Sequence, residues 1–313
     1  MPASERRDRA LVLINPRARL AGRRGWRDEA VAALASRYAV ELVAPSDAND
    51  TTRSALEAAG DGYSVIVAAG GDGTVNAVAQ GLCGTPTALG ILPLGSANDL
   101  ARELGIPRSI PAAARRIAGG TPRAADLAGV GDRIFCGVGG VALVARATLA
   151  VMRLKQRSAI GRWGANLLGG GIYRVSATAA LIDPGSIDEE IRIAYREPSS
   201  DTWRERETRV SALFVTNHRT LGGGMVLPVD ADASDGVLEI CLVPSRPRLS
   251  LMLNFARLSA GRQIPEGVLV PVRATEMTIE TGRADAFVAD GELLARGSRF
   301  DVRVLPRALR VIW

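Results

Sequence analysis

The sequence lacks any long apolar stretch. No run approaches the roughly 18 consecutive apolar residues of a membrane-spanning helix, so we expect none. The first residues, MPASERRDRA, are charged and contain no apolar segment, so we expect no secretory signal peptide.

Cysteine and histidine are scarce. Cys83, Cys136 and Cys241 lie far apart and form neither a disulfide framework nor a CxxC metal motif, which favours a reducing, cytoplasmic setting. The single histidine, His218, stands in the turn TNHRTLGGG without a partner motif. We therefore expect a loop residue with no catalytic role.

Apolar residues and arginine are plentiful. The chain has 313 residues, of which 47% are hydrophobic, enough for two domains or one large α/β domain. The net charge is +6, and nearly all the positive charge is arginine, whose planar fork suits phosphate. A nucleotide, lipid headgroups or nucleic acid would be a suitable partner for this charge. The alternative explanation is a GC-rich genome, which favours arginine codons.

The first part of the chain alternates between strand and helix patterns, which predicts a parallel sheet with helices on both faces. The expected strands are 11–15, 40–44, 63–70 and 87–95, and the expected helices are 26–38, 51–59, 74–82 and 96–104.

After about Leu127 the pattern changes to short apolar runs separated by turn signals, which predicts a mostly antiparallel second domain. The expected strands are 178–182, 191–195, 210–216 and 237–243, with one helix at 249–259 and two short strands on either side of Pro306.

The segment Gly70–Gly71–Asp72–Gly73–Thr74 follows a buried strand and precedes a helix. Glycines allow backbone N–H groups to approach a phosphate, and the helix N-terminus, which Thr74 can cap, attracts anions. The segment matches neither GxxxxGK[ST] nor GxGxxG. Asp72 would repel phosphate unless Mg²⁺ or an arginine intervened. The alternative is an ordinary tight turn with Asp72 as a local cap.

A second strand, turn and helix occupies residues 90–104, with Ser96, Asn98 and Asp99 at the helix start and Arg102 one turn later. In a parallel sheet both loops open at the carboxyl ends of their strands, where such sheets bind ligands. Together they predict a triphosphate site, and two ordinary capped helices are the alternative.

Asn15–Pro16, GGDGTVN at 70–76 and LPLGSANDLAREL at 92–104 resemble the diacylglycerol kinase catalytic-domain family. That family includes bacterial lipid kinases, sphingosine kinases and ceramide kinases, and is distantly related to NAD kinases. Residues 221–235, the triplet 290–292 and the closing LPRALRVI extend the resemblance over essentially the whole chain.

The resemblance implies a set of ATP-binding residues, of which Asp72, Asp99 and Asp126 fall on the carboxylates around Mg·ATP. The set is Asn15, Gly70, Gly71, Asp72, Gly73, Thr74, Val75, Asn76, Ser96, Asn98, Asp99, Arg102 and Asp126. It further implies a structural Mg²⁺ site at Asp232, Asp235 and the Val237 carbonyl, and oxygen ligands in a tight loop suit that ion.

The catalytic residues that the resemblance implies are Glu292 as the base, Asp290 as its supporting group and Asp72 in the Mg·ATP network. Asp290–Gly291 alone would more simply be a hairpin turn with a solvated Glu292. The chain also departs from the family pattern. Ala77 stands where the family has an acid, Ala44 where it has Thr, Gly137 where it has Asn, and Val144 where it has Asp.

We therefore expect a Rossmann-like parallel-sheet domain, residues 1–126 with 303–313 returning to it, and an antiparallel β-sandwich acceptor domain, residues 127–302. The cleft between them would be the active site. The function that follows is an ATP- and Mg²⁺-dependent lipid kinase of phospholipid metabolism. A kinase of a soluble compound such as NAD and a weakened nucleotide-binding regulatory module are the alternatives.

The basic and apolar segment from Arg146 to Arg174, with Trp163, predicts peripheral contact with an anionic membrane. An amphipathic helix with a solvated basic face is the alternative. We expect a cytoplasmic protein at the inner face of the membrane with no nucleic-acid partner. The sequence leaves the oligomeric state undecided, with a homodimer as one possibility.

Overall fold

The computed structural model describes residues 8–157, 171–182, 188–221 and 225–313. Two units make up the chain: Met1–Ala125 with Arg307–Trp313, and Asp126–Pro306. Of the segment predicted to contact a membrane, residues 158–170, which include Arg162 and Trp163, lie outside the described residues.

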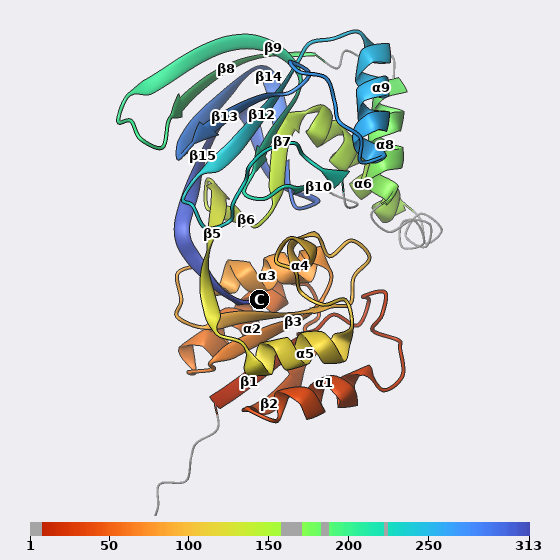
Figure 1. The fold of residues 1–313 in the computed structure, drawn as a ribbon, viewed down its shortest axis with the longest axis vertical. Coiled ribbons are helices and arrows are strands. Elements are labelled where there is room, and N and C mark those ends of the chain that lie inside the picture. Colours follow the sequence, from red (N-terminus) through yellow and green to blue (C-terminus); the bar gives the residue numbers. More distant parts are fainter. Residues whose placement is uncertain (1–7, 158–170, 183–187, 222–224) are drawn as a thin grey trace, which may run out of the picture. The chain divides into compact units, whose positions relative to one another are not determined.

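Unit 1 is an α/β unit built on a parallel sheet (Figure 1). Its strands run in the order β2-β1-β3-β4, all parallel, and β4 is followed by the end of β15. The runs VIVAAG of β3 and ALGILP of β4 are buried at every position, as in strands covered on both faces. The elements are β1 (Asp8–Ile14), α1 (Trp26–Leu34), β2 (Tyr38–Val43), α2 (Ala48–Gly60), β3 (Val65–Gly70), α3 (Asp72–Leu82), β4 (Ala88–Pro93), α4 (Asp99–Glu103) and α5 (Ile110–Gly119).

Unit 2 is rich in antiparallel strands, and each pairing recorded within it is antiparallel. The rings of Phe135 and Phe300 each lie 5.8 Å from Phe287 in its core. The elements are β5 (Pro122–Val130), β6 (Arg133–Phe135), β7 (Val138–Ala142), α6 (Leu143–Arg157), α8 (Gly171–Ile182), β8 (Glu189–Arg196), β9 (Trp203–Thr216), β10 (Thr220–Leu221), β11 (Met225–Val226), β12 (Leu238–Pro244), α9 (Arg248–Ser259), β13 (Val270–Ala274), β14 (Glu276–Ala289) and β15 (Glu292–Ile312).

The predicted α/β chain with an antiparallel C-terminal domain is confirmed, while the finer Rossmann-like description stays a prediction. Three local predictions are wrong. The run TAALI at 178–182 is the end of helix α8, because a five-residue apolar run fits either structure. Residues 300–312 form one strand that continues through Pro306, and the first helix ends at Leu34.

Strand β15 belongs to both units. Its residues up to Arg303 pair with β14, whereas Arg310 and Val311 pair with β4. Pro306 lies between these two ladders, where its missing N–H interrupts neither of them.

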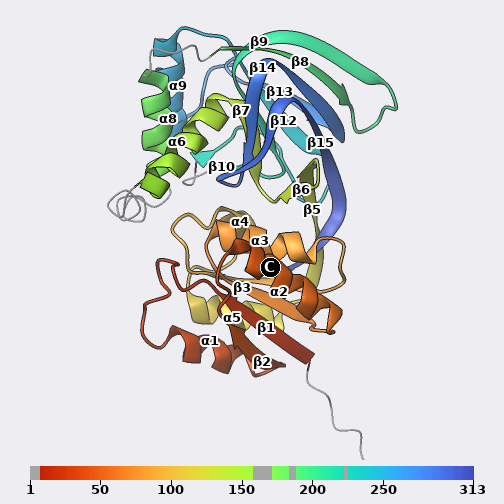
Figure 2. The same cartoon turned by 180° about the vertical axis from the view of Figure 1, so that it is seen from behind.

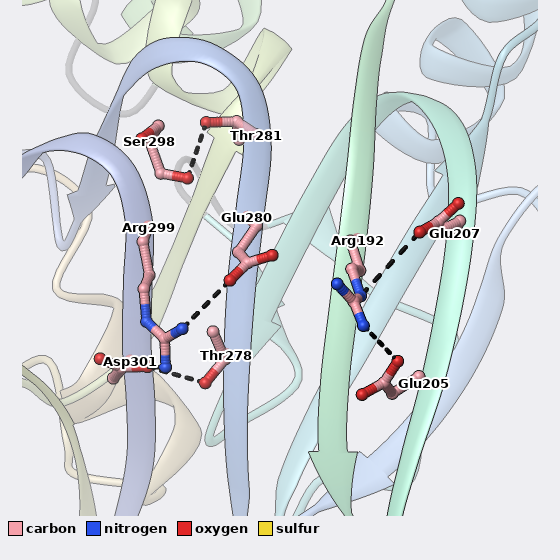
Figure 3. Close-up of polar contacts among 9 residues, drawn as sticks. All are labelled: Arg192, Glu205, Glu207, Thr278, Glu280, Thr281, Ser298, Arg299 and Asp301. Carbon is pink, nitrogen blue, oxygen red and sulfur yellow. Dashed lines mark hydrogen bonds and ion pairs between the residues drawn. The ribbon is translucent and has the colours of Figure 1, made fainter.

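One face of the unit 2 sheet carries paired charges in cross-strand ladders (Figure 3). Arg192 of β8 lies 2.6 Å from Glu205 of β9, and Arg299 of β15 lies 3.1 Å from Glu280 of β14. Arginines and carboxylates alternate, so this surface neutralises much of its own charge. Exposed pairs of this kind contribute little to stability individually.

Helices α6, α8 and α9 lie together beside the unit 2 sheet in both views (Figures 1 and 2). Ser176 of α8 donates to the Ala147 carbonyl of α6 at 2.7 Å, and Leu181 and Leu251 share a small apolar cluster. Within the part of the chain that the structure describes, no helix is both long enough and apolar enough to cross a bilayer.

Candidate active site

The two glycine loops of unit 1 lie side by side at the carboxyl ends of β3 and β4. Gly70 and Pro93 are register partners, and the Gly70 carbonyl accepts hydrogen bonds from the N–H groups of Leu94 (2.8 Å) and Gly95 (3.1 Å). A Cβ on Gly95 would lie 2.4 Å from the Gly71 Cα. The contact is therefore backbone against backbone, and it requires a glycine at position 95.

Asp72 joins these two loops. Its Oδ2 accepts a hydrogen bond from the Asn98 N–H at 3.0 Å, and its Oδ1 accepts one from the Asp99 N–H at 2.6 Å. Burial raises the pKa of the Asp72 carboxyl, and the N–H donors from Asp99 and Asn98 oppose that rise. The carboxylate thus positions the second loop, an arrangement that neither Mg²⁺ nor an arginine is needed to explain.

Asn98 closes the second loop on itself. It adopts a left-handed backbone (φ 51°), and its side-chain amide both accepts from the Gly95 N–H and donates to the Gly95 carbonyl, each at 3.0 Å. Arg102 donates to the Ala97 carbonyl at 3.3 Å. Ser96 is exposed beside them, so a hydroxyl and a guanidinium flank a rigid turn.

Asn15 extends the site to the end of β1. Its N–H donates to the Ala69 carbonyl at 3.0 Å, and its side chain donates to the Thr74 hydroxyl at 3.1 Å. Helix α3 begins at Asp72 with Gly71 as its N-cap, so the expectation that Thr74 caps the helix is wrong. Val75 and Asn76 are buried in α3, whereas Gly73 is exposed at its first turn.

Asp126 lies in unit 2 and holds the loop that contains the predicted metal ligands. It is buried, its Oδ2 accepts from the Gly236 N–H at 2.6 Å, and its own N–H donates to the Ala233 carbonyl at 2.6 Å. Its carbonyl accepts from the Asn217 side chain at 2.7 Å. The structure thus groups Asp126 with the predicted metal loop.

The carboxylates of that loop have protein partners. Asp232 accepts from the N–H and the hydroxyl of Ser234, at 2.9 and 2.7 Å. Asp235 accepts from the Val237 N–H at 3.0 Å and from Arg273 at 2.5 Å. Burial raises the pKa of Asp235, Arg273 lowers it, and Asp232 and Asp126 raise it.

Oxygen donors in a short loop are the right chemistry for Mg²⁺. Among the described residues, however, no three His, Cys, Asp or Glu side chains are arranged to hold a metal ion, and Arg273 places a cation on Asp235. A bound ion would have to replace Arg273 as the cation beside Asp235. The metal site stays a prediction, and no step of the reaction is derived through it.

Asp290 and Gly291 form the two-residue turn between β14 and β15. Both have positive φ, 49° and 82°, as in the tight turns favoured by right-handed strand twist. The Asp290 carboxylate accepts from the N–H groups of Cys136 at 2.7 Å and Gly137 at 3.0 Å. Like Asp72, it uses both oxygens to hold a separate segment of backbone.

Glu292 lies just after the turn in a different environment. Its side chain is 38% exposed, and its Oε2 lies 3.6 Å from the Arg133 guanidinium. No backbone clamp of the Asp290 kind is recorded for it among the described residues. Of the two acids in the triplet, Glu292 is therefore the one whose recorded partner is a side chain and not backbone N–H groups.

His218 is the residue whose surroundings the sequence did not reveal. It is 2% exposed, and a Cβ on Gly137 would lie 2.7 Å from its Nε2 and 2.7 Å from Asp290 Oδ1. The imidazole therefore lies beside the predicted catalytic triplet, in the space that a side chain at position 137 would enter. The one feature of the sequence that could have indicated this environment is Gly137, which stands where the family pattern has Asn.

The remaining departures lie elsewhere. Ala44 is exposed after β2, Ala77 is buried in α3, and Val144 packs beside Ala145 at the start of α6. The Gly222–Gly224 part of the predicted family stretch lies outside the described residues.

Comparisons with known proteins agree with the resemblance. The diacylglycerol kinase catalytic domain matches residues 9–130, and the YegS C-terminal NAD kinase beta sandwich-like domain matches residues 173–313. A probable lipid kinase YegS-like from Pseudomonas putida is 30% identical over 272 residues, covering 85% of this chain and 82% of that protein. A diacylglycerol kinase from Bacillus subtilis is 27% identical, covering 82% of this chain and 80% of that protein.

The fold has a solved counterpart. The crystal structure of a putative diacylglycerol kinase from Bacillus anthracis superposes with a TM-score of 0.79 at 22% identity, covering 100% of this chain and 97% of that one. At this identity the likeness establishes the fold alone.

Proposed function

Since the chain belongs to the diacylglycerol kinase catalytic-domain family, we propose that it transfers the γ-phosphoryl group of ATP to a hydroxyl of a diacylglycerol-like lipid. The observation that carries the proposal is the pair of glycine loops at the ends of β3 and β4, locked together by Asp72. Kinase relatives over most of the chain support the choice of a phosphotransferase.

ATP binds at the two loops of unit 1 in this proposal. The first turn of α3 offers backbone N–H groups and the positive end of its dipole to the phosphates. Asp72, Asn98 and Asn15 hold the loops in place before the nucleotide arrives. A preformed site of this kind lowers the ordering cost of binding, and phosphoryl transfer depends largely on such positioning. Mg²⁺ carried by the nucleotide would neutralise phosphate charge.

Glu292 serves as the general base in the proposal. A lipid hydroxyl has a pKa far above neutrality, so its attack is aided by an acceptor for the proton. Glu292 is partly exposed, whereas Asp290 is held by two backbone N–H groups. We assign Asp290 the role of fixing the turn that carries Glu292.

A product assay tests the function. The protein is incubated with radiolabelled ATP and Mg²⁺, with extracted membrane lipids in one reaction and NAD in another. We expect label in a chloroform-soluble phospholipid. Label in a water-soluble product would overturn the lipid assignment in favour of a soluble acceptor. Binding of ATP without turnover on either pool would favour a regulatory module instead.

The proposed acceptor determines where the protein works. Diacylglycerol-like lipids reside in membranes, so the proposal places the chain at the cytoplasmic face of a bilayer, in phospholipid metabolism.

A further inference from the structure

The helices of unit 2 concentrate exposed apolar side chains. Of the ten large hydrophobic residues exposed in the described parts of the chain, five lie on α6, α8 and α9. They are Leu154 (50% exposed), Val175 (56%), Ile182 (63%), Leu249 (68%) and Leu253 (56%). Single exposed leucines need no explanation, but a cluster on neighbouring helices marks an interaction surface.

The four side chains on α8 and α9 point away from the protein interior. Leu249 and Leu253 are four residues apart and Val175 and Ile182 seven apart, so each pair shares one side of its helix. The inward sides carry other residues, Ser176 and Leu181 on α8 and Leu251 on α9, which are buried.

A hydrogen bond joins the two helices. The Arg248 guanidinium at the start of α9 donates to the Leu181 carbonyl near the end of α8 at 2.9 Å. The end of α8, with Ile182, and the start of α9, with Leu249, therefore lie close to each other. Figures 1 and 2 both show α8 and α9 side by side, and we call the exposed apolar stripes of these two neighbouring helices, Val175, Ile182, Leu249 and Leu253, the α8–α9 face.

The charged side chains that α6, α8 and α9 themselves carry have one sign. The sequences of α6, α8 and α9 contain no Asp or Glu. The described basic side chains of these helices are Arg146, Arg153, Arg174, Arg248 and Arg257. The sheet face in Figure 3 differs in composition, because arginines and carboxylates both occur on it.

An occupant of this surface must accept both apolar side chains and positive charge. Nucleic acid offers phosphate but no medium for exposed Leu and Ile, whereas an apolar protein groove does not use the charge. A bilayer with anionic headgroups provides both within a few ångströms of depth.

We propose that the α8–α9 face, with Leu154 beside it, docks the protein on an anionic lipid bilayer. The surface differs from the segment between Arg146 and Arg174 that the sequence indicated, because its four exposed apolar side chains all lie beyond Arg174, and Leu249 on α9 is the most exposed of them. The proposal rests on the proposed function only in that a lipid kinase must meet its acceptor at a membrane.

Vesicle co-sedimentation tests the docking. The full chain is mixed with vesicles of phosphatidylcholine, with or without one third phosphatidylglycerol, at low and high salt. We expect wild type to bind the anionic vesicles at low salt and to be weakened by salt. The double variant Leu249→Ser/Leu253→Ser should bind at least about tenfold more weakly, since it loses two apolar anchors.

Leu56→Ser is the matched control, because Leu56 is 57% exposed on α2 of unit 1. It should bind vesicles as wild type does, and thermal melting should show all variants folded. Equal binding by the double variant and wild type would overturn the proposal. So would a wild-type dimer in sedimentation velocity that the double variant converts to monomer, because the occupant would then be a second copy.

A separate readout distinguishes this proposal from the proposed function. Turnover on a short-chain diacylglycerol dispersed as monomers needs no bilayer, so the double variant should keep wild-type turnover there. If the double variant loses turnover on the dispersed substrate while folded, the face is not a docking surface. If wild type itself shows no turnover, the proposed function fails, and the vesicle data still decide the docking.

Discussion

The glycine loops of unit 1 and the acidic turn of unit 2 are held by the same kind of contact, which fixes a different structure in each. Asp72 and Asp290 each accept two backbone N–H donors from another segment. In unit 1 the clamped segment lies 26 residues away and is the second glycine loop. In unit 2 it lies 154 residues away, and the clamp fixes a turn beside Glu292. An acid in a family motif can thus hold the backbone of another segment in place.

The largest expected effect separates the two acids of the turn. Glu292→Gln should lower turnover on the order of a hundredfold or more, because it removes a general base, and leave stability unchanged. Asp290→Asn should instead cost about 1–3 kcal/mol of stability, because one backbone N–H loses its acceptor. Steady-state kinetics and thermal melting distinguish these outcomes.

Glu280→Gln is the control, since Glu280 is an exposed partner of Arg299 on the sheet face. It should change neither readout. If Asp290→Asn loses turnover without losing stability while Glu292→Gln stays active, the roles are reversed. If Glu292→Gln and Asp290→Asn both stay active, residues 290–292 form a turn without a catalytic role.

The next effect tests the backbone contact in unit 1. A methyl group at residue 95 would lie 2.4 Å from the Gly71 Cα, so Gly95→Ala must push the loops apart. Overpacking of this kind costs about 1–3 kcal/mol, and we expect ATP affinity to fall about tenfold or more. Calorimetric titration measures it. Gly60→Ala, where nothing lies within 4 Å of the added methyl, should bind ATP normally, and an equal loss in both would refute the contact.

A smaller effect tests the space shared by His218 and residue 137. Gly137→Asn places a side chain against the imidazole and Asp290, so it should destabilise the protein by about 1–3 kcal/mol. His218→Gly in the same chain should recover most of that loss. A double-mutant cycle in denaturant measures the coupling, and strictly additive single effects would show that the two positions do not share this space.

The smallest effect is the pH dependence that Asp72 gives to stability. Burial raises its pKa, so the folded state holds the proton more tightly than the unfolded chain does. Stability of wild type should therefore fall, relative to Asp72→Asn, as pH rises from the ordinary value of 3.8 through the raised value. Urea unfolding at pH 4 and pH 7 measures the difference, with the exposed Asp61→Asn as control. A wild-type stability that rises with pH relative to Asp72→Asn would contradict the raised pKa of Asp72.

The sequence predicted what is local in this molecule. A buried strand, a glycine turn and a helix follow one another directly at Gly70–Thr74, so this local structure could be predicted from the pattern alone, and phosphate binding by the loop stays a prediction. The contacts of Asp72 could not be predicted from the sequence. Its partners are backbone N–H groups of another loop, and almost every residue type has such a group. The environment of His218 depends on Gly137 and Asp290, which come from other strands. The end of the helix at 171–182 was predicted to be a strand. The run TAALI is too short to show whether its apolar residues repeat with the spacing of a helix or of a strand.

The course of β15 has a consequence for the protein's synthesis. The edge of β4 is completed only by Arg310 and Val311, and Arg307–Trp313 emerge from the ribosome after the whole of Asp126–Pro306. At about 5–20 residues per second this interval is roughly 10–35 s. During that time the nascent first unit presents an unpaired strand edge, the kind of surface on which chains aggregate and chaperones act.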